Sequence, residues 1–308
     1  MAAADVPALV PYAFLEEREM FKCLMPGPTR FDEPFFYDSI LKHKHSEGQQ
    51  QITLRAADLP ETQTEKTVPL NLLIFHISRC GSTLLTQMLS QSDKNIVLSE
   101  PMVVDELLRS NLTVEKKKSL IRKCVNLLGQ QKSGKEKYMT IKLDSWHIIY
   151  LPLLKEIFSD AKILFLFREP GPVVFSHQKF RGRQMVPGVL KNICLTEDSA
   201  AFISLDDYTM QVLATFYKEM IVKANSADFL LDYAVLMREL PALLKACDMV
   251  FEPEDYQLVM QRAVYHSKED SRKFTGDGSG CDIKQRDKAH MKQLYEYYEQ
   301  LLSLKKSF

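Results

Sequence analysis

Residues 76–83 read HISRCGST and combine residue types that can bind a phosphate-like anion. Gly81 allows the backbone to approach a ligand closely, Arg79 supplies a positive charge, and two hydroxyl side chains follow. If a helix begins after this turn, its unpaired backbone N–H groups and the positive end of its dipole add further donors. The residues that we expect to bind the anion are Arg79, Cys80, Gly81, Ser82 and Thr83.

This segment differs from the phosphate-binding loop of nucleotide hydrolases, which has the pattern G-x-x-x-x-G-K-[ST]. His76 stands in the place of the first glycine, and Ser82 stands in the place of the lysine that reaches the β- and γ-phosphates of ATP. Arg79 brings a cation from another point of the loop, so the pattern favours an anion other than a magnesium-bound triphosphate. The alternative interpretation is a helix that is capped by Ser82 and binds no ligand.

A second candidate anion-binding segment follows the apolar run Lys162–Phe167. Arg168 comes directly after this run and can pair with a phosphate through two parallel hydrogen bonds. Ser176, eight residues later, can add a hydroxyl donor. Either segment alone is a weak signal, but the two together predict one anion-binding site.

Two further segments carry groups that could accept a proton from a substrate. Glu100 follows an apolar run and precedes a proline, and Asp144 and His147 lie close to the end of another such run. Structural interpretations compete with this one. An acidic residue at a helix N-terminus interacts favourably with the helix dipole, and a histidine in an apolar segment is more often a buried structural residue.

The elements that position these residues follow from the alternation of apolar runs with helical segments. Apolar runs of strand length are typical of strands buried on both faces of a parallel sheet. Their alternation with helices predicts a parallel α/β sheet, whose ligands lie beyond the carboxyl ends of the strands. The predicted strands are Leu70–Phe75, Asn95–Leu98, Tyr138–Leu143, Lys162–Phe167 and Asp228–Leu231, and the predicted helices between them are Thr83–Gln91, Val114–Leu128, His147–Phe158 and Ala200–Ala224.

The two ends of the chain differ from this central pattern. Residues 1–66 predict an irregular N-terminal extension, with a short helix near Phe35–Lys44, packed on the core formed by residues 67–308. After Tyr233 the pattern is mostly helical, and a basic, glycine-containing loop at His266–Cys281 could meet an anion or serve as a linker. The predicted C-terminal helices are Ala234–Cys247, Glu254–Tyr265 and Asp282–Leu302.

The segment Arg79–Leu85, placed after a buried strand, resembles the 5′-phosphosulfate loop of sulfotransferases that use 3′-phosphoadenosine-5′-phosphosulfate. Arg168 and Ser176 match the order and spacing of the residues that bind the donor's 3′-phosphate in that family. The resemblance covers Leu70–Leu231 and implies a P-loop-type three-layer domain, with a central parallel sheet flanked by helices and a helical C-terminal half. It also implies this donor as co-substrate, no metal, and a basic loop over the 3′-phosphate, a part that Arg272 could play.

The same resemblance suggests which residues act in catalysis. Several branches of the family use a glutamate in the region of Glu100 as the base, which makes Glu100 the first candidate, Asp144 the second and His147 the third. Lys142 matches a lysine of the family, while Asp144 stands where cytosolic members have a histidine. Arg79 could stabilise the departing phosphate.

These observations predict an enzyme that transfers a sulfuryl group from 3′-phosphoadenosine-5′-phosphosulfate to a hydroxyl or amine of an unidentified acceptor. One alternative is a P-loop kinase or hydrolase that uses ATP, for which Asp144 could hold magnesium. Another alternative is a nucleotide-binding protein without turnover, because a fold does not fix a function.

Composition excludes several other classes of protein. The 308 residues include 40 Lys and Arg against 40 Asp and Glu, and this balance argues against a broadly basic nucleic-acid-binding protein. We expect no secretory signal, because Met1–Met20 has no basic region followed by an apolar one. We expect no membrane span, because every apolar run is far shorter than the roughly 20 residues that a bilayer requires. The 6 cysteines are scattered without a C-x-x-C pair, which argues against a zinc cluster or a disulfide framework. We therefore expect a cytoplasmic protein that acts on a small-molecule or other acceptor.

Overall fold

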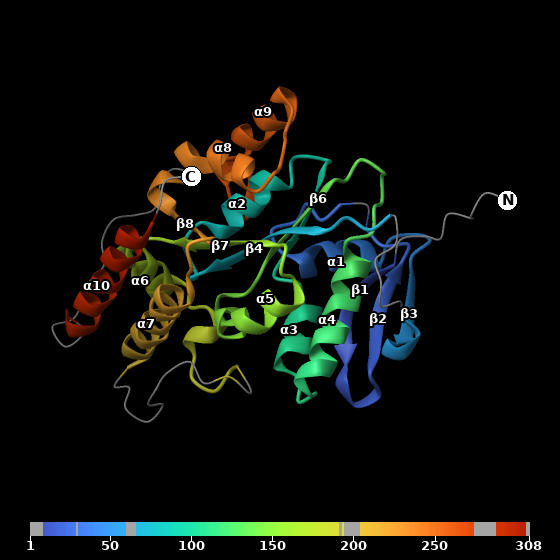
Figure 1. Ribbon diagram of the computed structural model, residues 1–308, viewed down its shortest axis with the longest axis horizontal. Helices are drawn as coiled ribbons and strands as arrows, with labels where there is room; N and C mark the ends of the chain where they lie inside the picture. The colour runs from blue at the N-terminus through green and yellow to red at the C-terminus, as the bar shows by residue number, and fades with distance from the viewer. Residues whose placement is uncertain are drawn as a thin grey trace.

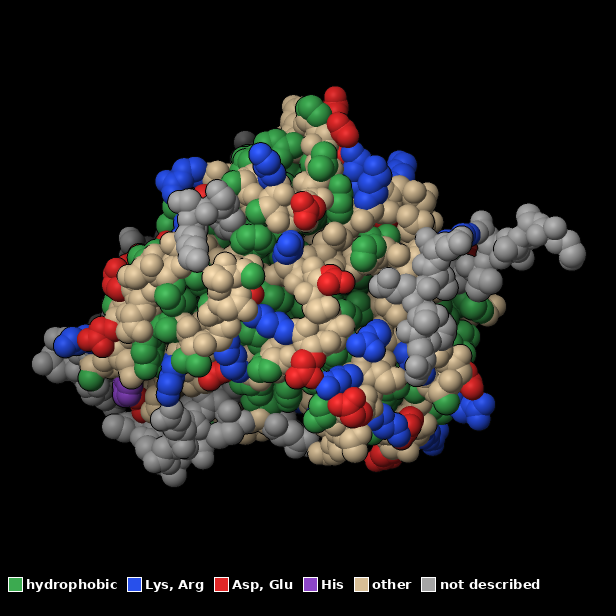
Figure 2. Space-filling model, in the orientation of Figure 1, with side chains coloured by type: hydrophobic (Ala, Val, Ile, Leu, Met, Phe, Trp, Pro, Cys, Tyr) green, Lys and Arg blue, Asp and Glu red, His purple; other side chains and the backbone are tan. Residues whose placement is uncertain are grey.

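The computed structural model describes residues 9–28, 30–59, 66–190, 193, 204–273 and 288–305, without the side chains of His266, of residues 269–273 and of Lys288. Figure 1 shows a central sheet between two layers of helices, with a second, smaller sheet beside it. On the face in Figure 2, acidic and basic side chains are interspersed, in keeping with the net charge of +0.

The central sheet has five parallel strands in the order β5-β6-β4-β7-β8. This arrangement confirms the predicted fold class. The observed bounds are close to the predicted ones, because the interior strands are buried on both faces and are therefore continuously apolar. The strands are β4 (Leu70–His76), β5 (Asn95–Ser99), β6 (Tyr138–Lys142), β7 (Lys162–Phe167) and β8 (Phe229–Asp232).

The strand order creates a natural binding site at the end of β4. From β4 the chain first moves to the β5 edge of the sheet, then returns through β6, and finally builds β7 and β8 on the other side. The loops after β4 and after its neighbours therefore diverge at this point. In open α/β sheets, ligands bind in the crevice that such a change of direction leaves beyond the carboxyl ends of the strands.

Helices cover both faces of the sheet. In Figure 1, α2, α8 and α9 lie above the sheet, while α3, α4, α5 and α7 lie below it, and α10 packs against α7 and α6. The helices are α2 (Ser82–Leu89), α3 (Met102–Arg109), α4 (Val114–Leu128), α5 (Leu151–Ile157), α6 (Pro170–Lys179), α7 (Leu205–Lys223), α8 (Leu236–Ala246), α9 (Pro253–Arg262) and α10 (Lys288–Leu304).

One predicted helix is divided. The segment expected to be helical over His147–Phe158 is a 3₁₀-helix at Ser145–Tyr150, followed by α5 with Pro152 in its first turn. Proline suits the first turn of a helix because its missing N–H has no partner there. The divided segment therefore carries its histidine on a tight turn rather than on a regular helix.

The N-terminal region is more ordered than the sequence predicted. It contains an antiparallel sheet of β1 (Val10–Leu15), β2 (Met20–Met25) and β3 (Gln50–Arg55), together with α1 (Phe36–Lys44). This sheet packs its β1 side on α3 and α4 (Figure 1). The expectation of irregular structure was wrong because Pro11 lies at an irregular register of β1 and because β3 has no buried residue, so neither strand shows the continuous apolar run of the central strands.

The C-terminal part contains a short hairpin before α10. Its strands are β9 (Tyr265–His266) and β10 (Glu269–Lys273), so the expected basic loop at His266–Cys281 begins as a hairpin. The side chain of Arg272 and residues 274–281 lie outside the described part of the chain. None of the described helices combines the length and the apolar character that crossing a lipid bilayer requires.

Candidate active site

A cavity of about 620 Å³ lies at the carboxyl edge of the central sheet. Its walls come from the loops after all five strands, from Phe35 in the segment before α1, and from the β9–β10 hairpin. The volume falls within the usual range of about 300–1,000 Å³ for small-molecule and cofactor sites. The predicted candidate segments after β4, β5, β6 and β7 all reach this cavity.

The loop between β4 and α2 turns tightly enough to present its backbone to the cavity. Ser78, Arg79 and Gly81 have φ angles of 74°, 52° and 84°, which lie in the left-handed region. Gly81 is the residue that caps α2, and the helix starts at Ser82. The alternative interpretation of Ser82 as the helix cap is therefore wrong, and the loop has the strand–turn–helix form of an anion-binding site.

Gly81 is required by its surroundings as well as by its backbone angle. A Cβ at this position would lie 2.3 Å from Cδ2 of Tyr233, which follows β8. The guanidinium carbon of Arg168 lies 4.4 Å from the centre of the same tyrosine ring. Tyr233 therefore packs between the loop after β4 and Arg168 after β7, and its ring sets the spacing between them.

The two predicted anion-binding segments meet in the folded chain. Nε of Arg79 donates a hydrogen bond of 2.8 Å to Oγ of Ser176, which lies on α6. Nη1 of Arg168 lies 3.5 Å from the carbonyl oxygen of Arg79. Arg79, Arg168 and Ser176 all line the cavity, so the order and spacing of these residues in the sequence correspond to one site.

The other predicted loop residues have different environments. Gly81 and Thr83 line the cavity, whereas Ser82 is buried at the start of α2. The Cys80 thiol is buried and donates to the carbonyl oxygen of Leu166 on β7. Burial raises the pKa of Cys80 to about 11, so the thiol stays protonated. Because this side chain packs the loop against β7, only the backbone of Cys80 is left to contact a ligand.

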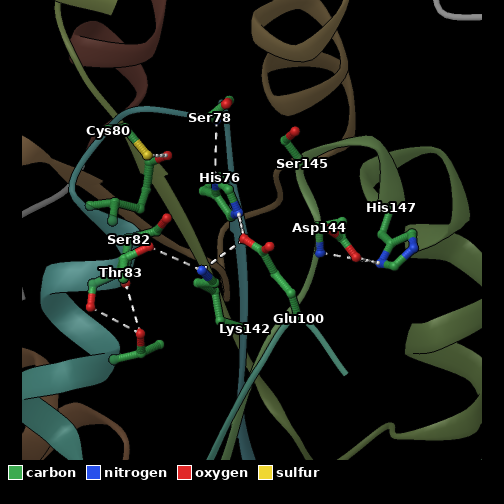
Figure 3. Close-up of polar contacts among 12 residues, drawn as sticks. His76, Ser78, Cys80, Ser82, Thr83, Glu100, Lys142, Asp144, Ser145 and His147 are labelled. Carbon is green, nitrogen blue, oxygen red and sulfur yellow. Dashed lines mark hydrogen bonds and ion pairs between the residues drawn. The ribbon is translucent and has the colours of Figure 1, made fainter. Parts of the chain in front are cut away.

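A charged cluster lies next to this loop, as Figure 3 shows. Nζ of Lys142 is 2.8 Å from Oε1 of Glu100 and donates a 3.3 Å hydrogen bond to Oγ1 of Thr83. Lys142 is fully buried, and Glu100, with a φ of 56°, follows β5 in a strained conformation. The lysine therefore stands between the anion-binding loop and a carboxylate.

His76, at the end of β4, orients this cluster from the other side. Its Nδ1 accepts a 3.0 Å hydrogen bond from the backbone N–H of Ser78, so the ring proton lies on Nε2. Nε2 points toward Oε1 of Glu100 at 3.7 Å (Figure 3). Burial lowers the pKa of His76, and the imidazole is therefore neutral at pH 7.

Glu100 and Asp144, the first two candidate bases, have opposite pKa shifts. Burial alone would raise the pKa of Glu100, but the Lys142 ammonium and the nearby His76 hold it well below its usual range. Burial raises the pKa of Asp144 well above its usual range, and the negative charges of Glu100 and Asp105 raise it further. Glu100 is an ionised carboxylate at neutral pH, whereas the surroundings of Asp144 favour its protonated form, so Glu100 is the more readily available proton acceptor of the two.

His147, the third candidate base, is held away from the cavity. Its Nε2 bonds to Oδ1 of Asp105 at 2.8 Å, and its Nδ1 accepts from the backbone N–H of Asp144 at 3.3 Å. The ring is 1% exposed and does not line the cavity, whereas Asp144 and Trp146 do. The structural interpretation of His147 is therefore the better one.

Asp105, Asp144 and His147 form a group whose ligand atoms lie within 4.8 Å of one another. Asp105 already accepts hydrogen bonds from Arg109, Trp146 and His147. A carboxylate that accepts from a guanidinium, an indole and an imidazole has its lone pairs engaged. The geometry of this group thus fits a hydrogen-bond network that fixes the turn after β6.

Several residues of the cavity carried no signal in the sequence. Nε2 of Gln184 donates to Oγ of Ser78 at 3.0 Å and to Oγ of Ser145 at 3.3 Å, and thereby joins the loops after β4 and β6. The Phe35 ring has the ammonium of Lys142 at 5.1 Å and that of Lys268 at 5.2 Å. Of Gln184, Phe35 and Lys268, only Lys268 lay in a segment that the sequence had singled out for an anion, the basic loop at His266–Cys281.

Comparison with known proteins gives matches among solved structures alone. No protein-family model matches the chain, and no curated protein matches it. A sulfotransferase domain from the curacin biosynthetic pathway is 15% identical, with a TM-score of 0.45, over 74% of this chain and 98% of that one. Sulfotransferase STF9 from Mycobacterium avium is 12% identical, with a TM-score of 0.47, over 85% of this chain and 80% of that one. A sulfotransferase domain from the Synechococcus PCC 7002 olefin synthase is 14% identical, with a TM-score of 0.44, over 80% and 98% of the two chains.

Proposed function

We propose that this chain transfers a sulfuryl group from 3′-phosphoadenosine-5′-phosphosulfate to a hydroxyl or amine of a small-molecule acceptor. The observation that carries the proposal is the hydrogen bond between Arg79 and Ser176. It joins two anion-binding segments, 97 positions apart, at one cavity. A donor with a phosphosulfate at one end and a separate phosphate at the other requires two such segments.

The donor set of the cavity suits the two ends of this co-substrate. Arg168 and Ser176 would hold the 3′-phosphate, while Arg79, Thr83 and the backbone N–H groups at the start of α2 would hold the 5′-phosphosulfate. Arg272 is proposed to approach the 3′-phosphate from the β9–β10 hairpin. The core of residues 67–308 would carry the reaction, and the extension of residues 1–66 would supply Phe35 to the cavity.

Glu100 is proposed as the general base. It would take the proton of the acceptor while the acceptor oxygen or nitrogen forms a bond to sulfur. The bond between sulfur and the 5′-phosphate oxygen breaks in the same step, and adenosine 3′,5′-bisphosphate leaves. Arg79 and Lys142 would stabilise the charge that develops on the departing phosphate.

The ion pair between Lys142 and Glu100 suggests how the base becomes active. In the absence of donor, the ammonium lies 2.8 Å from the carboxylate and holds its pKa low, so the carboxylate is a weak base. The same ammonium already contacts Thr83 of the loop, and an incoming phosphosulfate would draw it in that direction. Loss of the ion pair would raise the pKa of Glu100 and make it a stronger base when the donor is bound.

The ATP-dependent alternative is less well supported. Ser82 occupies the position of the P-loop lysine and is buried, and burial raises the pKa of Asp144, the candidate magnesium ligand, well above its usual range. A nucleotide-binding protein without turnover would share the donor site and differ only in the reactivity of Glu100. The four described cysteines are free thiols, which favours a reducing compartment, and we propose that the chain acts in the cytoplasm.

A thermal-shift comparison tests the proposal. Adenosine 3′,5′-bisphosphate at 100 times its dissociation constant should stabilise the protein by about 2.7 kcal/mol, and ADP with magnesium at the same concentration should not. A shift with ADP and magnesium alone would favour the kinase alternative. Transfer of label from the ³⁵S-labelled donor to acceptors in a screen would then separate an enzyme from a binding protein.

A further inference from the structure

A second cavity, of about 300 Å³, lies at the opposite end of the central sheet. It is formed by the first residues of the edge strand β5, by the segment at Arg30 and Phe31, and by the turn between α4 and β6. No residue lines both this cavity and the proposed active site. We call it the β5 cavity.

Two side chains at the β5 cavity lack a partner of a particular kind: the Asn95 amide lacks a hydrogen-bond acceptor, and the Lys132 ammonium lacks a carboxylate. Asn95 is 7% exposed, its Oδ1 accepts from Thr140, and its Nδ2 has no hydrogen-bond partner. Nζ of Lys132 donates only to the backbone carbonyls of Leu128 and Gln130 and forms no ion pair with any described residue. A buried donor without an acceptor is costly, and a half-buried ammonium without a counter-charge is also unfavourable.

The acidic side chains of the β5 cavity are already engaged. Both oxygens of Glu136 accept backbone N–H groups at Lys132 and Ser133, and Asp93 pairs with Arg30 at 2.5 Å. Neither carboxylate lies within ion-pair distance of Lys132. Burial consequently lowers the pKa of Lys132 to about 8, although the charge of Glu136 acts in the other direction.

The rest of the lining is apolar. Phe31, Ile96 and Val97 are each less than a tenth exposed, and Nζ of Lys132 lies 5.3 Å from the centre of the Phe31 ring. The cavity therefore pairs a cationic, donor-rich side with an apolar side. Its volume is at the lower limit of small-molecule sites, which favours a small ligand.

We propose that the β5 cavity binds a small monocarboxylate, with its carboxylate on Lys132 and Asn95 and its short hydrocarbon part against Phe31, Ile96 and Val97. The carboxylate supplies the missing acceptor for Asn95 and the missing counter-charge for the Lys132 ammonium. The site is distinct from the proposed sulfuryl-transfer centre and does not depend on that function.

Protection of Lys132 from acetylation tests this site in the unmodified full-length chain. A limiting amount of an acetyl N-hydroxysuccinimide ester is applied, and acetylation is followed residue by residue by peptide mass spectrometry. Butyrate at ten times its dissociation constant should slow acetylation of Lys132 about ten-fold, because the occupied fraction is protected. Lys135, which has a 68% exposed side chain on the same turn, should react at an unchanged rate.

Butyramide, which has nearly the same shape without the charge, should give no protection. Equal protection of Lys132 and Lys135, or no saturable protection of Lys132 by butyrate, would show the proposal to be wrong.

Calorimetric titration of three variants with butyrate locates the binding independently. Lys132→Met should abolish binding, whereas Lys135→Met and Arg168→Ala should retain it. Binding that survives Lys132→Met but is lost in Arg168→Ala would place butyrate in the proposed active site and overturn the assignment. If Lys132→Met does not fold, the acetylation experiment on the wild-type chain still decides the question.

Discussion

The loops after β4 and β7 differ in kind from the loops after β5 and β6, although all four reach the same cavity. The first pair presents arginines and hydroxyls, joined by the Arg79–Ser176 hydrogen bond. The second pair presents two carboxyls, Glu100 and Asp144, whose pKa values are shifted in opposite directions. We call the first pair the binding side and the second the reactive side.

This difference separates what residue type determines from what environment determines. An arginine is charged in nearly any surroundings, so its presence at a strand end already indicates an anion site. A carboxyl group becomes a base or an acid according to its burial and its neighbours. The four predictions below therefore test the two sides separately, with donor affinity as the readout for one and turnover or pH dependence as the readout for the other.

The largest effect is expected on the reactive side. Glu100→Gln should slow sulfuryl transfer by about 10²–10⁴-fold while donor affinity stays within a small factor, since general-base catalysis typically contributes that much. The measurement is transfer from the ³⁵S-labelled donor to an acceptor found by screening. Thermal unfolding must accompany it, because the buried Lys142 loses its counter-charge.

Glu115→Gln is the matched control for Glu100→Gln, as Glu115 has an 82% exposed side chain on α4. Turnover near the wild-type rate in a folded Glu100→Gln protein would show that Glu100 is not the base. The proposed difference in role between the binding side and the reactive side would then be wrong.

On the binding side, Arg168→Ala should weaken binding of adenosine 3′,5′-bisphosphate by about 1.5–3 kcal/mol, the range for a charge-assisted hydrogen bond. Isothermal titration measures this loss. Arg55→Ala, at a 71% exposed side chain on β3, should bind like wild type. Unchanged affinity in Arg168→Ala would mean that the anion is held elsewhere.

Gly81→Ala should disturb the binding side through its backbone. The left-handed conformation alone costs a non-glycine residue about 1–2 kcal/mol, and the added Cβ would collide with Tyr233. We expect a lower unfolding free energy in chemical denaturation. The double variant Gly81→Ala/Tyr233→Ala should relieve the collision but not the backbone strain. If the two changes are additive in a double-mutant cycle, Tyr233 does not limit this position.

The smallest effect is expected in the pH dependence of the unfolding free energy, which has opposite signs for Asp144 and Glu100 because their pKa values shift in opposite directions. The folded-state pKa of Asp144 lies above its ordinary 3.8, so the residue stabilises the fold at low pH and this contribution is lost as the pH rises through the folded-state pKa. Asp144→Asn cannot ionise, so the difference between its unfolding free energy and that of wild type should grow in favour of the variant as the pH rises above 3.8, the ordinary pKa of the group. Asp160→Asn, on an exposed turn, is the control. A difference that stays constant or shrinks with pH would contradict the raised pKa of Asp144.

The sequence predicted the central sheet well because strands that are buried on both faces consist mostly of apolar residues, which form recognisable runs in the sequence. β7, for example, has the predicted bounds Lys162–Phe167 and is buried along nearly its whole length. The strands of the N-terminal sheet were missed, since each is partly exposed and their pairing depends on contacts with α3 and α4. Local pattern does not encode such contacts.

The residues of the candidate site can likewise be separated into those that the sequence could identify and those that it could not. Arg79, Arg168 and Ser176 could be identified from order and spacing, because the carboxyl ends of parallel strands must converge. Gln184 and Phe35 could not, as each reaches the cavity from a segment without a motif. The protonation states of Glu100 and Asp144 also lay beyond the sequence, because they depend on Lys142, His76 and Asp105 in three dimensions.

The buried thiol of Cys80 can be used to measure how often the loop between β4 and α2 separates from β7. With a pKa of about 11, only about one thiol in ten thousand is a thiolate at pH 7, so alkylating reagents should leave the closed loop untouched. Alkylation of Cys80 would then proceed only through molecules in which the loop has separated from β7. The rate of that labelling, with and without a bound nucleotide, would report how often the loop detaches and how far a ligand suppresses the detachment.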